Sequence, residues 1–266
     1  MGQADRYFVA LSPARDLDAG ILKRVAEILG TDAYNARLLV AGEMPRIIAQ
    51  FPSPEPALAL ARELTSLGLS AVSGSQQELL REYAPTFIAH SLRLDEPEVT
   101  FQDIQGETRK ISQDSVFLIL EGELPVPEAE RQEVRTERKF NLQATLALGG
   151  IPVWRNKQIM VDKPGTYARF LRLYSHSSPE PLVEMRSGDF DYSSLGAKKG
   201  LSSTENFSTI GSELRGKFPR AVFDNRLTRT RRGSLSPFVS AETLEQYSRL
   251  IYMFYLVAAG ESARTE

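Results

Sequence analysis

The sequence predicts an α+β protein in which an N-terminal βαββαβ module precedes a mainly antiparallel β module capped by C-terminal helices. Two patterns of apolar spacing predict this organisation. In residues 1–74, short apolar runs alternate with two stretches in which apolar side chains recur every three or four positions, as on one face of a helix. From Thr86 onward the apolar side chains recur about every second position, as in half-buried strands. We therefore predict one module over residues 1–83 and a second over residues 84–266.

The N-terminal module is predicted to begin with a strand over Tyr7–Leu11, an apolar run that stops at a Ser-Pro pair. A helix should follow, because four apolar residues recur at spacings of four and three, and Gly30 suits the left-handed position beyond a helix end. These four residues are Leu17, Ile21, Val25 and Ile28. Residues 36–41 and 45–51 are β-rich runs separated by a short turn, and this hairpin spacing predicts that they pair antiparallel.

A second helix is predicted to begin at Pro54, with Ser53 as its N-cap, and to end at Gly68 before a short strand over residues 69–72. The resulting order is that of a ferredoxin-like module, in which helices cover one face of a small sheet. Residues 57–72 also resemble the helix-then-strand half of several small regulatory and peptide-binding ferredoxin-like modules. The same spacing of Ala and Leu is what any amphipathic helix packed on a strand requires.

The second module is predicted to contain several antiparallel strands and one irregular region. Residues 125–139 are rich in charge and contain two prolines, which predicts an exposed insertion. A helix is predicted over residues 202–218, because Ser202 and Glu205 form a capping-box pattern before an apolar stripe. A last helix is predicted over residues 241–258, where one face carries mostly aromatic and aliphatic side chains.

The net charge of −2 conceals two halves of opposite sign. Residues 1–122 hold 11 Lys+Arg against 17 Asp+Glu, which is −6, and the remaining residues hold 21 against 17, which is +4. Cysteine is absent, which excludes disulfides, thiolate nucleophiles and thiolate zinc sites and fits a reducing, cytoplasmic location. The apolar stretch at residues 251–259 is too short to span a bilayer, so we expect no membrane insertion.

Two short polar patterns suggest a ligand site: Arg131 with Arg135, and the sequence D-x-S-x-x-G at Asp191, Ser193 and Gly196. Together they resemble the signature of PilZ domains, which bind cyclic di-GMP. The resemblance implies that the two arginines clamp phosphates and guanine edges while the other three residues complete the site. The chain departs from that pattern, because a capped helix is predicted after the glycine where the family continues with strands. The alternative is a turn in which the glycine permits a positive φ.

Seven basic residues gather within residues 215–232, against one acidic residue. They are Arg215, Lys217, Arg220, Arg226, Arg229, Arg231 and Arg232. Such a charge density would attract the phosphates of nucleic acids or lipid head groups, but no nucleic-acid-binding motif accompanies it. We therefore expect weak polyanion binding or a partner-facing surface. Ser234 follows two arginines, which suits a basophilic kinase.

The sequence offers no pattern on which to base catalysis or metal binding. His90 and His176 fall on separate predicted strands without acidic residues at ligand spacing, and neither a nucleophile elbow nor a phosphate-binding glycine loop occurs. We therefore predict a non-catalytic regulatory or scaffold protein that needs no cofactor and acts through a protein partner. A cyclic di-GMP sensor is the alternative, and an enzyme whose site is assembled from scattered polar residues is a further one.

Overall fold

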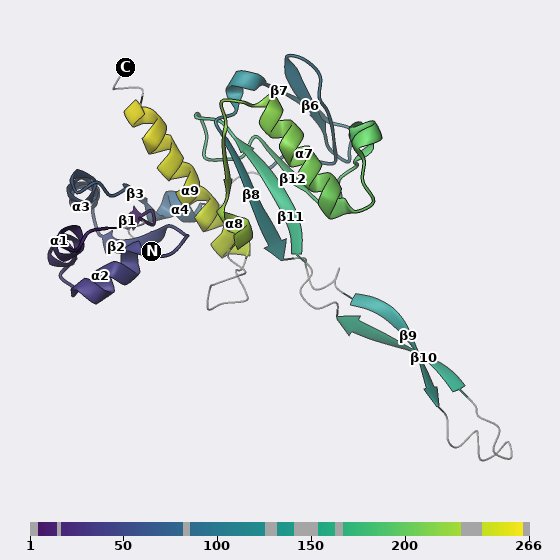
Figure 1. Ribbon diagram of the computed structural model, residues 1–266, viewed down its shortest axis with the longest axis horizontal. Helices are drawn as coiled ribbons and strands as arrows, with labels where there is room; N and C mark the ends of the chain where they lie inside the picture. Colours follow the sequence, from purple (N-terminus) through teal and green to yellow (C-terminus); the bar gives the residue numbers. More distant parts are fainter. Residues whose placement is uncertain are drawn as a thin grey trace. The chain divides into compact units, whose positions relative to one another are not determined.

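A computed structural model shows a mixed α+β fold with several sheets (Figure 1). It describes residues 5–14, 17–81, 86–125, 132–140, 154–162, 167–229 and 241–262. Contacts divide the chain into a unit formed by residues 1–123 and 169–266 and a smaller unit formed by residues 124–168. Within the described ranges, no helix combines the length and the apolar character needed to cross a membrane.

The N-terminal sheet has three strands in the order β2-β1-β3, and both outer strands run antiparallel to the central one. They are β1 (Tyr7–Leu11), β2 (Arg46–Phe51) and β3 (Ala71–Ser75). The last four residues of β1 are buried, as expected of a central strand that is covered on both faces. The first predicted strand is confirmed at its predicted bounds.

One predicted strand is a helix. Residues 36–41 were expected to pair with the following strand, but nearly all of them lie in α2 (Ala33–Val40), so the four-stranded βαββαβ prediction is wrong at this element. The cause is local, because the Asp32 carboxylate caps the helix by accepting a hydrogen bond from a first-turn amide at 2.8 Å. Ala36 and Val40 are one helical turn apart and are the residues that the helix buries.

The two other predicted helices of this module are confirmed. α1 (Ala19–Leu29) ends at Gly30, whose φ of 60° is left-handed, and α3 (Pro54–Ser66) begins at the predicted proline. Ser53 occupies the N-cap position as predicted, but its side chain makes no capping hydrogen bond. Proline at the first helical position has no N–H, which leaves one donor fewer for a cap to satisfy.

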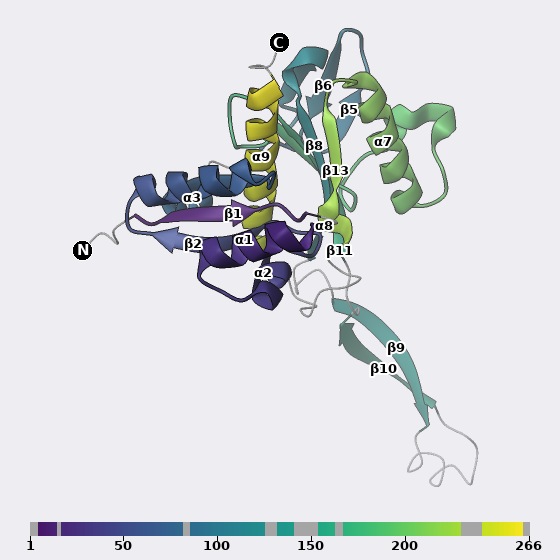
Figure 2. The ribbon, with the colours of Figure 1, turned by 60° about the vertical axis from the view of Figure 1, so that its left-hand side comes forward.

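Helices cover both faces of the N-terminal sheet (Figure 2). α1, α2 and α3 pack on the face that carries Val9, one of the odd-numbered residues of β1. Phe8, on the opposite face, packs with α4 (Gln76–Leu80) and α9 (Ala241–Ser262). α9 confirms the last predicted helix and extends beyond it. The sheet therefore shares a core with a helix that lies far beyond the module boundary predicted at residue 83.

The larger sheet has five strands in the order β13-β8-β11-β12-β4. They are β4 (Ile88–Ala89), β8 (Leu118–Pro125), β11 (Tyr167–Tyr174), β12 (Val183–Arg186) and β13 (Val222–Asn225). β11 pairs antiparallel with β12, whereas β13 runs parallel to β8 and β4 runs parallel to β12. The two parallel pairs lie at the edges of this sheet. In each of them the two strands are far apart in the sequence, as parallel pairing requires.

A second, antiparallel sheet and a long helix share one hydrophobic core with the five-stranded sheet (Figure 1). The strands of this sheet are β5 (Ser91–Arg93), β6 (Glu98–Gln102) and β7 (Thr108–Ser112). The helix α7 (Ser203–Lys217) confirms the prediction, and the Ser202 hydroxyl caps it by accepting from the Glu205 amide at 3.1 Å. Its apolar stripe, which includes Phe207 and Leu214, is buried in the same core as side chains of both sheets.

The smaller unit contains an antiparallel pair of long strands, β9 (Gln132–Phe140) and β10 (Trp154–Asp162) (Figure 1). β9 takes in residues 132–139 of the predicted exposed insertion, so this part of it is a regular strand rather than irregular, while its exposure stays a prediction. Val134 and Thr136 are strand-forming residues two positions apart among charged neighbours, which suits a strand better than a loop. Pro125, the first residue of the predicted insertion, ends β8, and residues 126–131 lie outside the described residues.

A buried network of ion pairs joins β11, β12 and α9. The Arg172 guanidinium donates to the Glu184 carboxylate at 2.7 Å and to the Glu245 carboxylate at 2.6 Å. Glu184 also accepts from Arg186 at 2.6 Å. Burial alone would raise the pKa of Glu184, but the charges of Arg172 and Arg186 and their hydrogen bonds hold that pKa below its usual value. Glu184 is therefore an anion at neutral pH, and the network depends on its charge.

Candidate functional site

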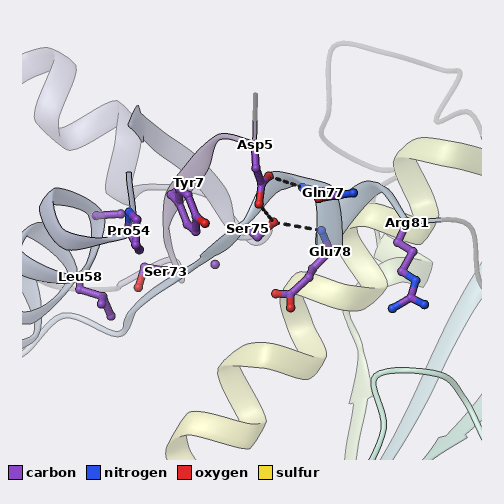
Figure 3. Close-up of a pocket in the computed structure, with 11 residues that line it drawn as sticks. Asp5, Tyr7, Pro54, Leu58, Ser73, Ser75, Gln77, Glu78 and Arg81 are labelled. Atoms are coloured by element: carbon purple, nitrogen blue, oxygen red, sulfur yellow. Dashed lines mark hydrogen bonds between the residues drawn. The ribbon is translucent and has the colours of Figure 1, made fainter. Parts of the chain in front are cut away.

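A groove of about 670 Å³ lies beside β3 in the N-terminal sheet, and we call it the β3 groove (Figure 3). Its lining residues include Asp5, Tyr7, Leu58, Ser73, Ser75 and Glu78. They come from β1 and the residues before it, from β3, and from the beginnings of α3 and α4. Its volume lies within the range of roughly 300–1,000 Å³ that is typical of ligand sites.

Hydrogen bonds fasten α4 to the strands at one end of the β3 groove (Figure 3). The Ser75 hydroxyl donates to Asp5 Oδ2 at 2.6 Å and accepts from the Glu78 amide at 3.3 Å, which makes Ser75 the N-cap of α4. The Gln77 amide donates to Asp5 Oδ1 at 3.2 Å. Both side chains therefore serve to hold the helix, and the described lining residues include no histidine that would activate the serine as a nucleophile.

The α3 side of the β3 groove is apolar. Figure 3 shows Pro54 and Leu58 on this side, where α3 begins. Leu58 is 45% exposed although its neighbour Ala57 is buried, so the leucine presents apolar surface to the groove. A partner that covered it would gain about 25 cal/mol for each Å² of apolar surface removed from water.

β3 lies at an edge of its sheet, and among the described strands it pairs only with β1. Hydrogen bonds at both ends of this pair fix the direction of the backbone groups between them. At one end the Ser12 amide donates to the Ser70 carbonyl at 3.0 Å, and at the other the Gln76 amide donates to the Arg6 carbonyl at 2.6 Å. Both pairs are hydrogen-bonded pairs of the antiparallel ladder.

Hydrogen-bonded pairs alternate with non-bonded pairs along such a ladder. Val72 and Gly74 are therefore the residues of β3 that exchange hydrogen bonds with β1. Ser73 alternates with them and directs its N–H and C=O groups to the outer edge of the sheet. The N–H of Ser75 has the same direction, whereas the C=O of Ser75 belongs to the first turn of α4. Because both serines line the β3 groove, this row of backbone donors and acceptors borders the groove.

The other edge strand of the sheet, β2, has three features that disfavour pairing with another chain. A register shift interrupts its ladder with β1, Pro45 precedes it, and Arg46 occupies its first position. The Arg46 guanidinium also donates to the Leu38 carbonyl of α2 at 2.9 Å. Bulges, prolines and charges are the means by which natural proteins blunt exposed strand edges. β3, with the sequence Ala-Val-Ser-Gly-Ser and an unbroken register, has none of them.

The α4 end of the β3 groove is acidic. Glu78 is exposed, and Figure 3 shows its carboxylate pointing back toward β3, whereas the Arg81 guanidinium points away from it. The Asp5 carboxylate lies at the same end. A bound molecule would therefore meet negative charge at the α4 end of the groove and apolar surface at the α3 end.

Little in the sequence signals this groove. Ser75 and Glu78 have the S-x-x-E spacing that marks a helix start, which is the one signal that would have found α4. No family model, curated protein or solved structure matches this chain. Asp5 and Leu58 come together with these residues only through the pairing of β1 with β3 and the packing of α3.

The aspartate, serine and glycine of the PilZ-like pattern lie in one turn, whereas its arginines belong to another part of the chain. Asp191 accepts hydrogen bonds from the Ser193 amide at 2.9 Å and the Ser193 hydroxyl at 2.7 Å, and these bonds lower the pKa of the aspartate. Gly196 has a φ of 52°, as the turn interpretation expects. Arg135 lies in β9 of the smaller unit, and Arg131 lies outside the described residues. A cyclic di-GMP site remains a prediction, while a local turn accounts for the aspartate and the serine.

Two members of the predicted basic surface pair with acidic residues that sequence order does not place near them. Lys217 lies 3.0 Å from the carboxylate of Glu96, and Arg220 lies 3.0 Å from that of Asp114. Each pair partly neutralises the positive charge that the local sequence suggested. The Arg220 pair is exposed and contributes little to stability, but both pairs reduce the field that a polyanion would meet.

Two other members of that surface are held by partners close in sequence or on a neighbouring element. Arg226, the first residue of α8 (Arg226–Arg229), pairs with the buried carboxylate of Asp224 at 2.7 Å. The Arg215 guanidinium lies over the Phe223 ring, 4.4 Å from its centroid. The side chains of Arg229, Arg231 and Arg232 lie outside the described residues, as does Ser234. The observed partners favour internal roles for the described part of the basic run.

The two histidines have separate surroundings. His90 lies between β4 and β5, and His176 follows β11 and stacks on the Phe117 ring at 4.1 Å between centroids. Among the residues that the structure describes, no group of three His, Asp or Glu side chains could hold a metal ion. His176 therefore has an aromatic packing partner.

Proposed function

We propose that this protein is a non-catalytic regulatory or scaffold protein that acts through protein–protein interaction, and that the β3 groove is its binding surface. The observation that carries the proposal is the open edge of β3 beside the exposed Leu58, because natural proteins usually blunt such edges. Asp5 and Ser75 support binding rather than catalysis, since both serve to hold α4. The cysteine-free sequence supports a cytoplasmic location.

We also propose that the N-terminal module is a ferredoxin-like module in which α2 takes the place of one strand. Helices connect β1 to β2 and β2 to β3, and β1 lies between the other two strands. β3 pairs antiparallel with β1 as in that fold, whereas β2 runs antiparallel to β1 where the split βαβ order has a parallel pair. α2 follows α1 at the point where the βαββαβ order has its second strand. In this arrangement β3 is an outer strand of the sheet.

Leu58→Glu is expected to abolish partner binding. The change puts a charge on the apolar wall, where a bound partner would have to exclude water from an unpaired carboxylate. The measurement is chemical crosslinking of the 266-residue chain in an extract of its native host, followed by mass spectrometry of the crosslinked proteins. Crosslinks that the wild type forms with residues of the β3 groove should disappear in the variant.

Leu38→Glu is the matched control. Leu38 is also 45% exposed and lies in a helix of the same module, but it does not line the β3 groove. This variant should form the same crosslinks as the wild type. Equal crosslinking by all three proteins would contradict the assignment of the binding surface.

A further inference from the structure

We propose that the partner enters the β3 groove as an extended segment, pairs with β3 as a fourth strand of the N-terminal sheet, and places a basic side chain against Glu78. This inference rests on the proposed function, since it names how the partner is recognised in the same groove. It follows from three features: the direction of the free backbone groups of β3, the chemistry of the two ends of the groove, and the charge of the groove and its module.

The backbone of β3 offers the hydrogen bonds that strand addition uses. The N–H and C=O of Ser73 and the N–H of Ser75 point outward, and these two residues are separated by the two-residue repeat at which an incoming strand places its own donors and acceptors. β3 has five residues, so a partner segment of similar length, about 17 Å when extended, covers it. Main-chain bonds of this kind supply affinity with little dependence on the partner's sequence.

The side chains around β3 supply the selectivity. Alternate residues of an added strand point to opposite faces of the sheet, so one set faces the wall formed by Pro54 and Leu58. That wall favours apolar residues in this set. At the α4 end the exposed Glu78 carboxylate favours a lysine or arginine. The expected segment is therefore extended, apolar at alternate positions, and basic at one end.

Charge favours a different protein over a second copy of this chain. Residues 1–83 hold 8 Lys+Arg against 10 Asp+Glu, a net charge of −2, and the β3 groove is lined by the carboxylates of Asp5 and Glu78 against the one guanidinium of Arg81. Pairing of two β3 strands would bring two acidic modules together, which like-charge repulsion opposes. The same negative charges would attract a basic segment of another protein.

The test replaces Ser73 by proline, because the N–H of Ser73 is needed to bind an added strand but not to pair with β1. Ser73→Pro removes the outward amide hydrogen of Ser73, whereas the ladder to β1 runs through Val72 and Gly74. Proline is tolerated where the N–H of an edge strand faces outward, so the sheet should be retained. Ser73→Ala keeps the amide and is the control. Circular dichroism of each variant checks that the fold is retained.

The probe is a phage-displayed library of random 12-residue peptides, selected against the 266-residue chain. Selected peptides should be enriched in β-branched residues and contain lysine or arginine near one end. Their affinity should fall at least tenfold in Ser73→Pro, stay within twofold in Ser73→Ala, and fall and lose its salt dependence in Glu78→Gln. Peptide binding should also slow amide exchange at Ser73 and Ser75 in the wild type, a measurement that does not depend on the folding of the proline variant.

Each other outcome overturns the proposal. Unchanged peptide binding in a folded Ser73→Pro, or unchanged exchange at both serines, excludes strand addition. Binding that Leu58→Glu abolishes and Ser73→Pro leaves intact would reject strand addition and keep the proposed function. A wild-type dimer that Ser73→Pro converts to a monomer would assign the edge to a second copy. Failure to select any peptide that binds the groove would reject a linear partner segment.

Discussion

Replacement of Arg172 by methionine is expected to lower the free energy of unfolding by about 3–5 kcal/mol, the usual cost of removing one partner from a buried ion pair. The side chains of Arg172 and Glu184 are only 8% and 2% exposed, so water cannot replace the lost partner. Glu245 on α9 would lose its 2.6 Å contact with Arg172 at the same time. Urea unfolding followed by circular dichroism measures the change.

Arg220→Met is the matched control for this prediction. Arg220 lies 3.0 Å from Asp114, a distance close to that of the buried pair, but both side chains are largely exposed. Water screens such a pair, so the midpoint of urea unfolding should hardly change. Similar losses in Arg172→Met and Arg220→Met would show that burial does not govern the strength of these contacts.

Phe8→Ala is expected to lower the free energy of unfolding by about 3–5 kcal/mol, as is usual when a buried aromatic side chain leaves a cavity. Phe8 is 1% exposed and packs in one cluster with Val72 of β3, Leu79 of α4 and Leu250 of α9. The loss should therefore loosen α9 as well as the N-terminal sheet. Urea unfolding measures the overall change, and amide exchange in α9 reports its local part.

Tyr34→Ala provides the comparison for Phe8→Ala. Tyr34 is also an aromatic residue of the N-terminal module, but it is 71% exposed in α2. Its removal should leave stability nearly unchanged, because it gives up little buried surface. If exchange in α9 remained unchanged in Phe8→Ala, the shared core between the first strand and the last helix would be contradicted.

The sequence predicted the long amphipathic helices because their signals are local. The apolar stripe of α7 and its cap at Ser202 lie within a few residues of each other, and so do the stripe of α1 and Gly30. α2 was missed although Asp32 is a cap of the same kind, because the run that follows it is short and ends in three consecutive apolar residues, Leu38, Leu39 and Val40, which also suit a buried strand. α4 is shorter still, so its cap at Ser75 carried little weight beside the strand pattern.

The candidate site could not be predicted in the same way. The free edge of β3 depends on which strand pairs with β1, and Tyr7 and Ser75 face each other only after the chain has passed through three helices. The basic run shows the converse error. Local density suggested a polyanion surface, but Lys217 and Arg220 find acidic partners on segments far away in the sequence. Long-range pairing decides both outcomes, and single-sequence periodicity does not report it.

Amide hydrogen exchange of the free protein tests the central claim most directly, because it reports the direction of each N–H in β3. Val72 and Gly74 donate to β1 in the structure and should exchange slowly, whereas Ser73 and Ser75 point to the open edge and should exchange fast. Residue-resolved exchange by nuclear magnetic resonance separates the four amides. Alternating slow and fast exchange along β3 is the predicted result, and strong protection of all four amides would contradict an open edge.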